Sequence, residues 1–293
     1  MTIDAMKAYL RRRIGGYTVA IKPMQTTNRI FRGVFCDELP NSVDRISYPP
    51  PELVRRPGRA NREHCSMFYG CVGAFPIFLE IHAKQGDLVA LSEWTVGEPL
   101  WMHNLGYHPD ALERLGLPMP NQGSQRAPLI TPIASETNYN RRIRRRMSLA
   151  FTADVPAGEE YRYKETIAIN ELLYDRASPI TTGGDNGLRS ERVAGTVYPT
   201  VKLRGLADNV VLWPNFVDRY LKIKSVRFLR VEAADELTLS YSFLTIGYSE
   251  RFSGKAIIWQ EALAPEPERR THVNFENGQW VFRDGSNKIY DVH

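Results

Sequence analysis

The sequence predicts a mixed α+β fold, and three observations support this. Short apolar segments of strand length alternate with short helical segments along the chain. Residues 224–233 and 236–246 alternate apolar and polar side chains with a period of two, so we expect an antiparallel pair there. Asn277-Gly278 then supplies the residues of a type I′ turn, which predicts a terminal antiparallel hairpin. This order does not fit a doubly wound parallel sheet.

In the first third of the chain, the sequence predicts strands and short helices on both sides of one rigid loop. The loop is 46–61, because its four prolines fix the backbone and remove N–H donors. The expected helices are 5–14 and 76–85, the second with a proline in its first turn. The expected strands are, in order, 17–24, a short strand within 28–40, 66–72 and 87–96.

The remaining chain predicts an insertion, a helix and a return to strands. Residues 104–158 hold six prolines and an arginine run, and they are too long for a simple connection, so a partly helical Pro/Arg-rich insertion is expected. A helix follows, with Ile169, Leu172 and Leu173 on one face. The expected elements after it are a Gly-rich loop at 179–195, a broken strand at 196–205, a strand at 209–214 and a short helix at 215–223. We expect one domain, 1–293, with a β-rich C-terminal extension at 234–293.

Composition points to a soluble protein with anionic ligands. Hydrophobic residues make up 43% and charged residues 24% of the chain, with a net charge of +5 and a pI of about 9.1. The charge fits both a small phosphate-bearing molecule and nucleic acid. The three cysteines include no C-x-x-C pair, which favours a reducing compartment, and there is no signal-peptide core or long apolar run. We therefore expect a cytoplasmic protein that does not contact a membrane.

The common catalytic motifs are absent or weak. The sequence has no Walker A loop, G-x-G-x-x-G turn, H-E-x-x-H helix or G-x-S-x-G elbow. His103, His108 and Asp110 lie close together as zinc ligands would, but a surface loop explains them better, so no metal is expected. The arginine run at 141–146 suits nucleic-acid phosphates or a solvated face paired with the acidic segment 153–160. Because no aromatic residues are interleaved with it, nucleic acid is not the partner we expect.

Six sequence elements in a fixed order carry the functional interpretation. They are Arg32, the Gly58-Arg59-Ala60-Asn61 loop, Tyr69, Glu80, the Tyr198-Pro199-Thr200 segment and Asn209. In this order and approximate spacing, the chain resembles the RES domain family, named for an Arg, a Glu and a Ser. The resemblance covers residues 29–96 and 160–231. It departs from the family at Thr200, where the family has Ser; threonine keeps the hydroxyl and either fills the role or marks a less active site.

The resemblance implies a fold and an activity. The fold would be similar to that of ADP-ribosyltransferases, with a mixed sheet core and short helices. The activity would be consumption of NAD+ by cleavage of the nicotinamide–ribose bond, with ADP-ribose passed to water, phosphate or a protein. Family members resemble toxins of toxin–antitoxin pairs, so a toxin-like effector is expected. Its partners would be NAD+ as substrate and a neutralising antitoxin or immunity protein, and a homodimer is also compatible.

The resemblance also assigns roles to individual residues. Glu80 would hydrogen-bond the ribose and stabilise its developing positive charge, with Arg32 and Thr200 completing the catalytic set. The expected NAD-binding residues are Arg32 and Arg59 on phosphate, Tyr69 against nicotinamide, Tyr48 as a stacking residue, and Asn61, Thr200 and Asn209 on polar edges. Each residue also has an ordinary structural interpretation. The alternative for the whole protein is a non-catalytic NAD sensor or a nucleic-acid-binding interaction protein.

Overall fold

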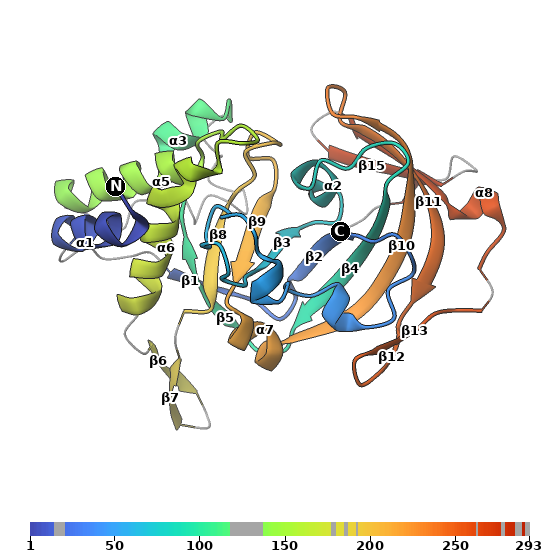
Figure 1. The fold of residues 1–293 in the computed structure, drawn as a ribbon, viewed down its shortest axis with the longest axis horizontal. Helices are drawn as coiled ribbons and strands as arrows, with labels where there is room; N and C mark the ends of the chain where they lie inside the picture. The colour runs from blue at the N-terminus through green and yellow to red at the C-terminus, as the bar shows by residue number, and fades with distance from the viewer. Residues whose placement is uncertain are drawn as a thin grey trace. The chain divides into compact units, whose positions relative to one another are not determined.

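The computed structural model describes residues 1–14, 21–117, 137–176, 180–184, 187–191, 193–261, 263–276, 279–284 and 289–290. These residues form a mixed α+β fold, which confirms the predicted class (Figure 1). The chain folds into two compact units that are interleaved in the sequence. Unit 1 comprises Met1–Asn28, Pro49–Tyr69 and Val96–Tyr220, and unit 2 comprises Arg29–Tyr48, Gly70–Thr95 and Leu221–His293.

Unit 1 contains a small mixed sheet with the strand order β1-β5-β8-β9. Its strands are β1 (Ile21–Met24), β5 (Leu100–Asn104), β8 (Gly195–Pro199) and β9 (Asp208–Leu212). The β5–β8 pair is parallel, and the other two pairs are antiparallel. Gly195 is required where β8 meets β9, because a Cβ there would lie 1.9 Å from the carbonyl oxygen of Val211.

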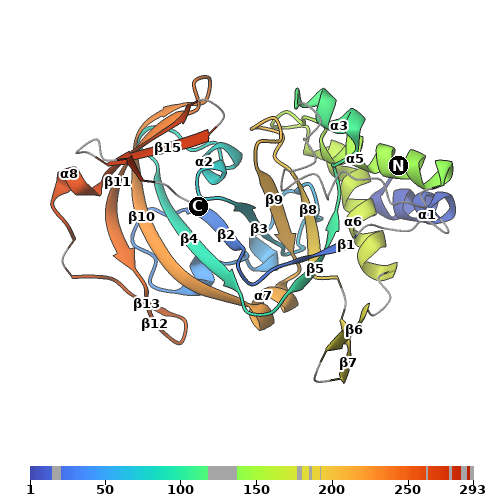
Figure 2. The same cartoon turned by 180° about the vertical axis from the view of Figure 1, so that it is seen from behind.

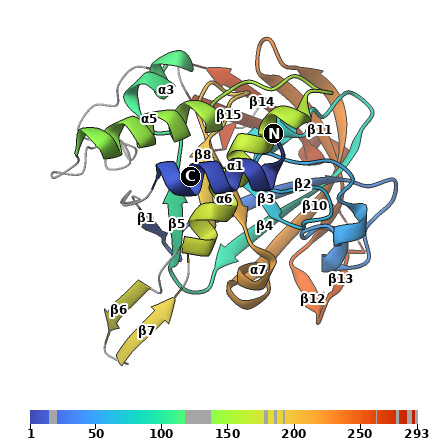
Figure 3. The same cartoon turned by 60° about the vertical axis from the view of Figure 1, so that its left-hand side comes forward.

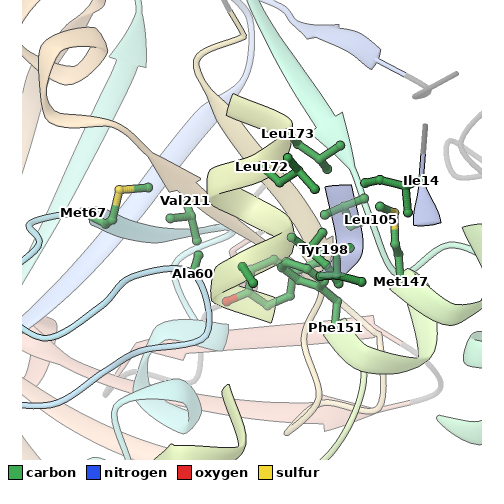
Figure 4. Packing of buried hydrophobic residues seen from close by; sticks show 13 residues of the cluster. Ile14, Ala60, Met67, Leu105, Met147, Phe151, Leu172, Leu173, Tyr198 and Val211 are labelled. Carbon is green, nitrogen blue, oxygen red and sulfur yellow. The ribbon is translucent and has the colours of Figure 1, made fainter. Parts of the chain in front are cut away.

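Helices supply many of the buried side chains of unit 1. α1 (Ile3–Arg13), α5 (Asn138–Phe151) and α6 (Lys164–Arg176) lie together in Figure 3. The predicted apolar face of α6 is confirmed, since Ile169, Leu172 and Leu173 are all buried. All three belong to one cluster with Phe151 of α5 and Tyr198 of β8. Figure 4 shows Leu172 and Leu173 in this cluster. The other helical segments are η2 (Pro51–Leu53), α3 (Pro109–Arg114), η3 (Glu160–Tyr163) and α7 (Pro214–Tyr220).

One segment of unit 1 differs from the sequence prediction. The Gly-rich loop expected at 179–195 contains a hairpin of β6 (Ile180–Gly184) and β7 (Gly187–Glu191), paired antiparallel. Glycine content suggested a loop, but only two residues separate the strands, which is a common hairpin length. Those two residues, 185–186, lie outside the described residues.

Unit 2 is built on a longer sheet with the order β3-β2-β4-β10-β11-β14-β15-β16. The strands are β2 (Arg29–Phe35), β3 (Phe68–Val72), β4 (Leu88–Val96), β10 (Leu221–Asp235), β11 (Ser240–Ser249), β14 (Arg270–Glu276), β15 (Gln279–Asp284) and β16 (Ile289–Tyr290). β10 and β11 form the predicted antiparallel pair, although β10 extends to Asp235 and the turn therefore comes later than expected. The predicted hairpin is confirmed by the β14–β15 pairing; its Asn277-Gly278 turn lies outside the described residues.

The sheet of unit 2 curls around the short helix α2 (Pro76–Glu80) (Figure 2). A Cβ on Gly33 of β2 would lie 2.3 Å from Ile77 Cγ2, so α2 packs directly on β2. The ring centroid of the adjacent Phe78 lies 4.2 Å from that of Phe243. Phe243 belongs to β11, which is the third strand from β2 along the sheet. Neighbouring side chains of one helix can reach both strands only if the sheet is strongly curved.

The remaining elements of unit 2 are short. They are η1 (Val43–Arg45), α8 (Glu266–Arg269) and the β12–β13 hairpin (Arg251–Ser253 and Ala256–Ile258). α2 is shorter than the predicted 76–85 helix because His82 adopts a left-handed conformation with φ of 55°. No helix in the described part of the chain is long and apolar enough to span a bilayer.

Candidate functional site

The Gly58-Arg59-Ala60-Asn61 loop and Tyr69 form one hydrogen-bonded unit. The Tyr69 hydroxyl donates to Asn61 Oδ1 at 2.7 Å and accepts from the backbone N–H of Ala60 at 2.9 Å. Asn61 Nδ2 donates to the carbonyl oxygens of Arg62 and Cys65 at 2.9 and 3.0 Å. Asn61 is buried, so these bonds satisfy a side chain that would be costly to bury alone. The polar groups of Asn61 and Tyr69 therefore stabilise the conformation of this loop.

Arg59 connects the same loop to the C-terminal end of α5 by hydrogen bonds. Its Nη1 donates to the carbonyl oxygens of Phe151 and Ala153, both at 3.0 Å. Its guanidinium carbon lies 5.0 Å from the ring centroid of Tyr163 and 5.8 Å from that of Tyr198. A cation at the C-terminal end of a helix also interacts favourably with the helix dipole. The structure thus brings Arg59 next to the first residue of the Tyr198-Pro199-Thr200 segment.

A buried network that the sequence did not indicate joins this loop to β8. Asn170 of α6 donates from Nδ2 to the carbonyl oxygen of Ala60 at 2.9 Å. Its Oδ1 accepts from the hydroxyl of Thr196 at 2.8 Å. Arg62 donates to the partly buried Glu171 and to the exposed Asp4, and these carboxylates raise the pKa of its guanidinium. No local sequence pattern identifies these partners, because each comes from a different part of the chain.

Thr200 and Asn209 lie at the connected ends of β8 and β9. Tyr198 and Asn209 are paired in the antiparallel register, and the backbone N–H of Thr200 donates to the Ala207 carbonyl at 2.9 Å. Thr200 and Asn209 are both buried. Among the described residues, the Thr200 hydroxyl has no hydrogen-bond partner. Most buried hydroxyls have a hydrogen-bond partner, so a buried hydroxyl without one is unusual. A polar group of a ligand could supply the missing hydrogen bond.

In unit 2, Arg32 and Tyr48 are brought to neighbouring positions. Arg32 Nε donates to the carbonyl oxygen of Ser47 at 2.9 Å, which fixes the chain immediately before Tyr48. Ser92 of the adjacent strand donates to the Arg32 carbonyl oxygen at 3.1 Å. The side chains of Arg32 and Tyr48 are both partly buried.

Glu80 is the last residue of α2, and its Oε1 atom is buried. Helix α2 packs on the face of β2 that carries Gly33. Because side chains alternate along a strand, Arg32 leaves β2 on the opposite face. The resemblance predicts that Arg32 and Glu80 act on one ligand, and this stays a prediction.

Two weaker sequence signals have structural roles in unit 1. His108 caps α3, with Nδ1 accepting from the backbone N–H of Asp110 at 3.3 Å, while burial lowers the pKa of His103 to about 4. No cluster of three metal-ligating side chains occurs among the described residues. In the arginine run, Arg145 pairs with Asp110 and Arg146 with Glu165, both outside the acidic segment 153–160 that the sequence suggested.

Comparison with known proteins gave no relatives. No protein-family model, curated protein or solved structure matches the chain.

Proposed function

We propose that this protein binds NAD+ and cleaves its nicotinamide–ribose bond within an ADP-ribosyltransferase-like fold, as a toxin-like effector. The observation that carries the proposal is the ordered series of six sequence elements from Arg32 to Asn209. The geometry of unit 1 is compatible with it, because Arg59, Thr200 and Asn209 gather around the connected ends of β8 and β9. The buried hydroxyl of Thr200 adds support, since it offers a ligand both a donor and an acceptor.

The proposed reaction needs a carboxylate and cations, which these residues supply. The bond between ribose C1′ and the nicotinamide nitrogen breaks, and its electron pair leaves with neutral nicotinamide. An oxygen of water, phosphate or a protein acceptor then bonds to C1′. If the acceptor is water or a hydroxyl, this oxygen loses its proton. Glu80 would stabilise the positive charge that develops on the ribose. Arg32 would hold phosphate through its guanidinium, which has five N–H donors and is oriented by Ser47.

The test is release of nicotinamide from NAD+ by the purified protein. We expect turnover by the wild type and its loss in Glu80→Gln, which keeps the shape of the side chain and removes its charge. Glu113→Gln is the matched control, because Glu113 is an exposed residue of α3 and should be dispensable. Mass spectrometry of the products separates water, phosphate and protein as acceptors.

Binding and turnover must be measured separately. If the folded wild type releases no nicotinamide, cleavage is wrong as the function. In that case, an NAD-dependent rise in the unfolding temperature would identify an NAD sensor. If Glu80→Gln turns over NAD+ as fast as the wild type, the role proposed for Glu80 is wrong.

A further inference from the structure

Unit 2 holds a cavity that the proposed NAD chemistry does not use. Its volume is about 490 Å³, which falls within the range of small-molecule sites. Its walls come from β2, β4, β10, β11, β14, β15 and the segment around α2, so the curl of the sheet creates it. The described lining contains none of the residues assigned to NAD: it is Arg29, Phe31, Ala74, Phe75, Phe78, Leu91, Glu93, Lys224, Ser225, Arg227, Leu229, Phe243, Thr245, Thr271, Val273 and Phe282.

The first feature of this cavity is a wall of five phenylalanines. They are Phe31 of β2, Phe75 and Phe78 at α2, Phe243 of β11 and Phe282 of β15. Phe75, Phe78 and Phe243 are buried, but Phe31 and Phe282 are only partly covered. The uncovered apolar area favours a ligand that displaces water from it. Aromatic rings among phenylalanines also gain from edge-to-face and offset contacts, which favours an aromatic ligand over an aliphatic one.

The second feature is the presence of three cations and one carboxylate in the lining. Arg29 Nε and Lys224 Nζ lie 3.2 and 3.0 Å from Glu93 Oε1, and the Ser225 hydroxyl donates to Glu93 Oε2 at 3.1 Å. Arg227 is the third cation, and its guanidinium lies over the ring of Tyr248 at 5.5 Å. The described lining therefore contains three cations and one carboxylate, an excess of two positive charges.

The charged and aromatic parts of the lining adjoin each other. Phe31 of β2 is paired with Glu93 of β4 in the antiparallel register, and Arg29 lies two residues before Phe31 on the same face of the strand. A ligand that occupies the aromatic part can therefore reach the cations with one short polar group.

We propose that this cavity binds an aromatic carboxylate. The ring would lie among the phenylalanines, and the carboxylate would accept hydrogen bonds from Arg29 and Arg227. A neutral aromatic molecule would leave the excess positive charge uncompensated and should bind less tightly. This site does not depend on NAD cleavage.

The experiment is calorimetric titration of the full chain with 2-naphthoate and with the neutral, similarly shaped 2-naphthamide. We expect saturable binding of one 2-naphthoate per chain and an affinity for the amide that is weaker by about tenfold or more, the scale of one charge-assisted hydrogen bond. The double variant Arg29→Gln/Arg227→Gln should weaken naphthoate by at least about the same factor and leave the amide unchanged. Arg12→Gln/Arg142→Gln is the control, because it removes two exposed charges from unit 1.

A second variant tests the location without changing the charge. Thr271→Trp places a large ring on the cavity wall and should abolish binding of both compounds while unfolding stays cooperative. The proposal is overturned if the folded wild type shows no saturable binding or binds acid and amide equally. It is also overturned if folded Thr271→Trp or the folded arginine double variant binds 2-naphthoate with wild-type affinity. Nicotinamide release from NAD+ by each variant, measured in parallel, keeps this result separate from the proposed function.

Discussion

Tyr69 and Asn61 are joined by a hydrogen bond of 2.7 Å between the phenol hydroxyl and the amide oxygen. The same hydroxyl accepts from the backbone N–H of Ala60. The resemblance to the RES family assigns the Tyr69 ring to the nicotinamide, and these bonds assign its hydroxyl to the loop. The two roles use different parts of one side chain, so they can be separated by mutation.

Tyr69→Phe should destabilise the protein and preserve NAD chemistry. Removing the hydroxyl leaves two groups of the loop without this partner, at a cost of about 1–3 kcal/mol in the free energy of unfolding. The phenyl ring remains, so nicotinamide release per folded molecule should be unchanged. Urea denaturation and the NAD assay on the same preparation provide the test. Normal stability with lost turnover would instead assign the hydroxyl to the ligand.

Arg59→Met should also destabilise the protein, by about 2 kcal/mol, because two backbone carbonyls at the end of α5 lose their donor. Arg56→Met on the same loop is the control, since Arg56 is exposed, and it should leave the unfolding midpoint near that of the wild type. The resemblance gives Arg59 a phosphate-binding role as well. An increase in KM for NAD+ in Arg59→Met, with stability unchanged, would favour that role over the structural one.

His103 should make stability depend on pH in mildly acidic solution. Burial lowers its pKa to about 4 in the folded protein, whereas an unfolded chain has a histidine pKa of about 6.5. Between these values the unfolded chain binds the extra proton, so the stability from neutral His103 is present above about pH 6.5 and is lost as the pH falls toward 4. The full loss is up to about 3 kcal/mol. His103→Leu should flatten the difference in unfolding free energy between pH 7 and pH 5; an unchanged slope would show that other groups control it.

Local patterns in the sequence predicted several of the elements and the buried face of one helix. The period-two alternation of 224–233 and 236–246 predicted the β10–β11 pair, and Asn277-Gly278 predicted the β14–β15 hairpin. The spacing of Ile169, Leu172 and Leu173 predicted the buried face of α6. Each of these features depends on residues that are close in the sequence.

Contacts between segments that are distant in the sequence could not be predicted from local patterns. Arg59 meets the Phe151 carbonyl 92 residues later, and Asn170 meets the Ala60 carbonyl 110 residues earlier. The cavity in unit 2 is lined by residues that are up to about 250 positions apart in the sequence, from Arg29 to Phe282. Single-sequence patterns carry no information about which distant backbone groups need a donor. The sequence therefore suggested the loop of Asn61 as a ligand site, whereas the structure shows the internal bonds that hold it.

Thr200 offers the sharpest separation of structural and functional roles, because Thr196 provides a matched control. Both threonines are fully buried, one inside β8 and one just after it. The hydroxyl of Thr196 donates to Asn170 Oδ1 at 2.8 Å, whereas that of Thr200 has no partner among the described residues. Thr196→Val should therefore lower the unfolding free energy by about 1–3 kcal/mol, and Thr200→Val should leave it nearly unchanged or raise it.

The effects of the two substitutions on NAD+ turnover should be the reverse of their effects on stability. Thr200→Val should reduce nicotinamide release strongly if its hydroxyl contacts the ligand, and Thr196→Val should retain the activity of each folded molecule. Thr200→Ser keeps the hydroxyl, removes only the methyl group, and should turn over NAD+ at least as fast as the wild type. If Thr200→Val is destabilised as much as Thr196→Val and keeps full activity, the hydroxyl of Thr200 supports the fold and does not bind the ligand.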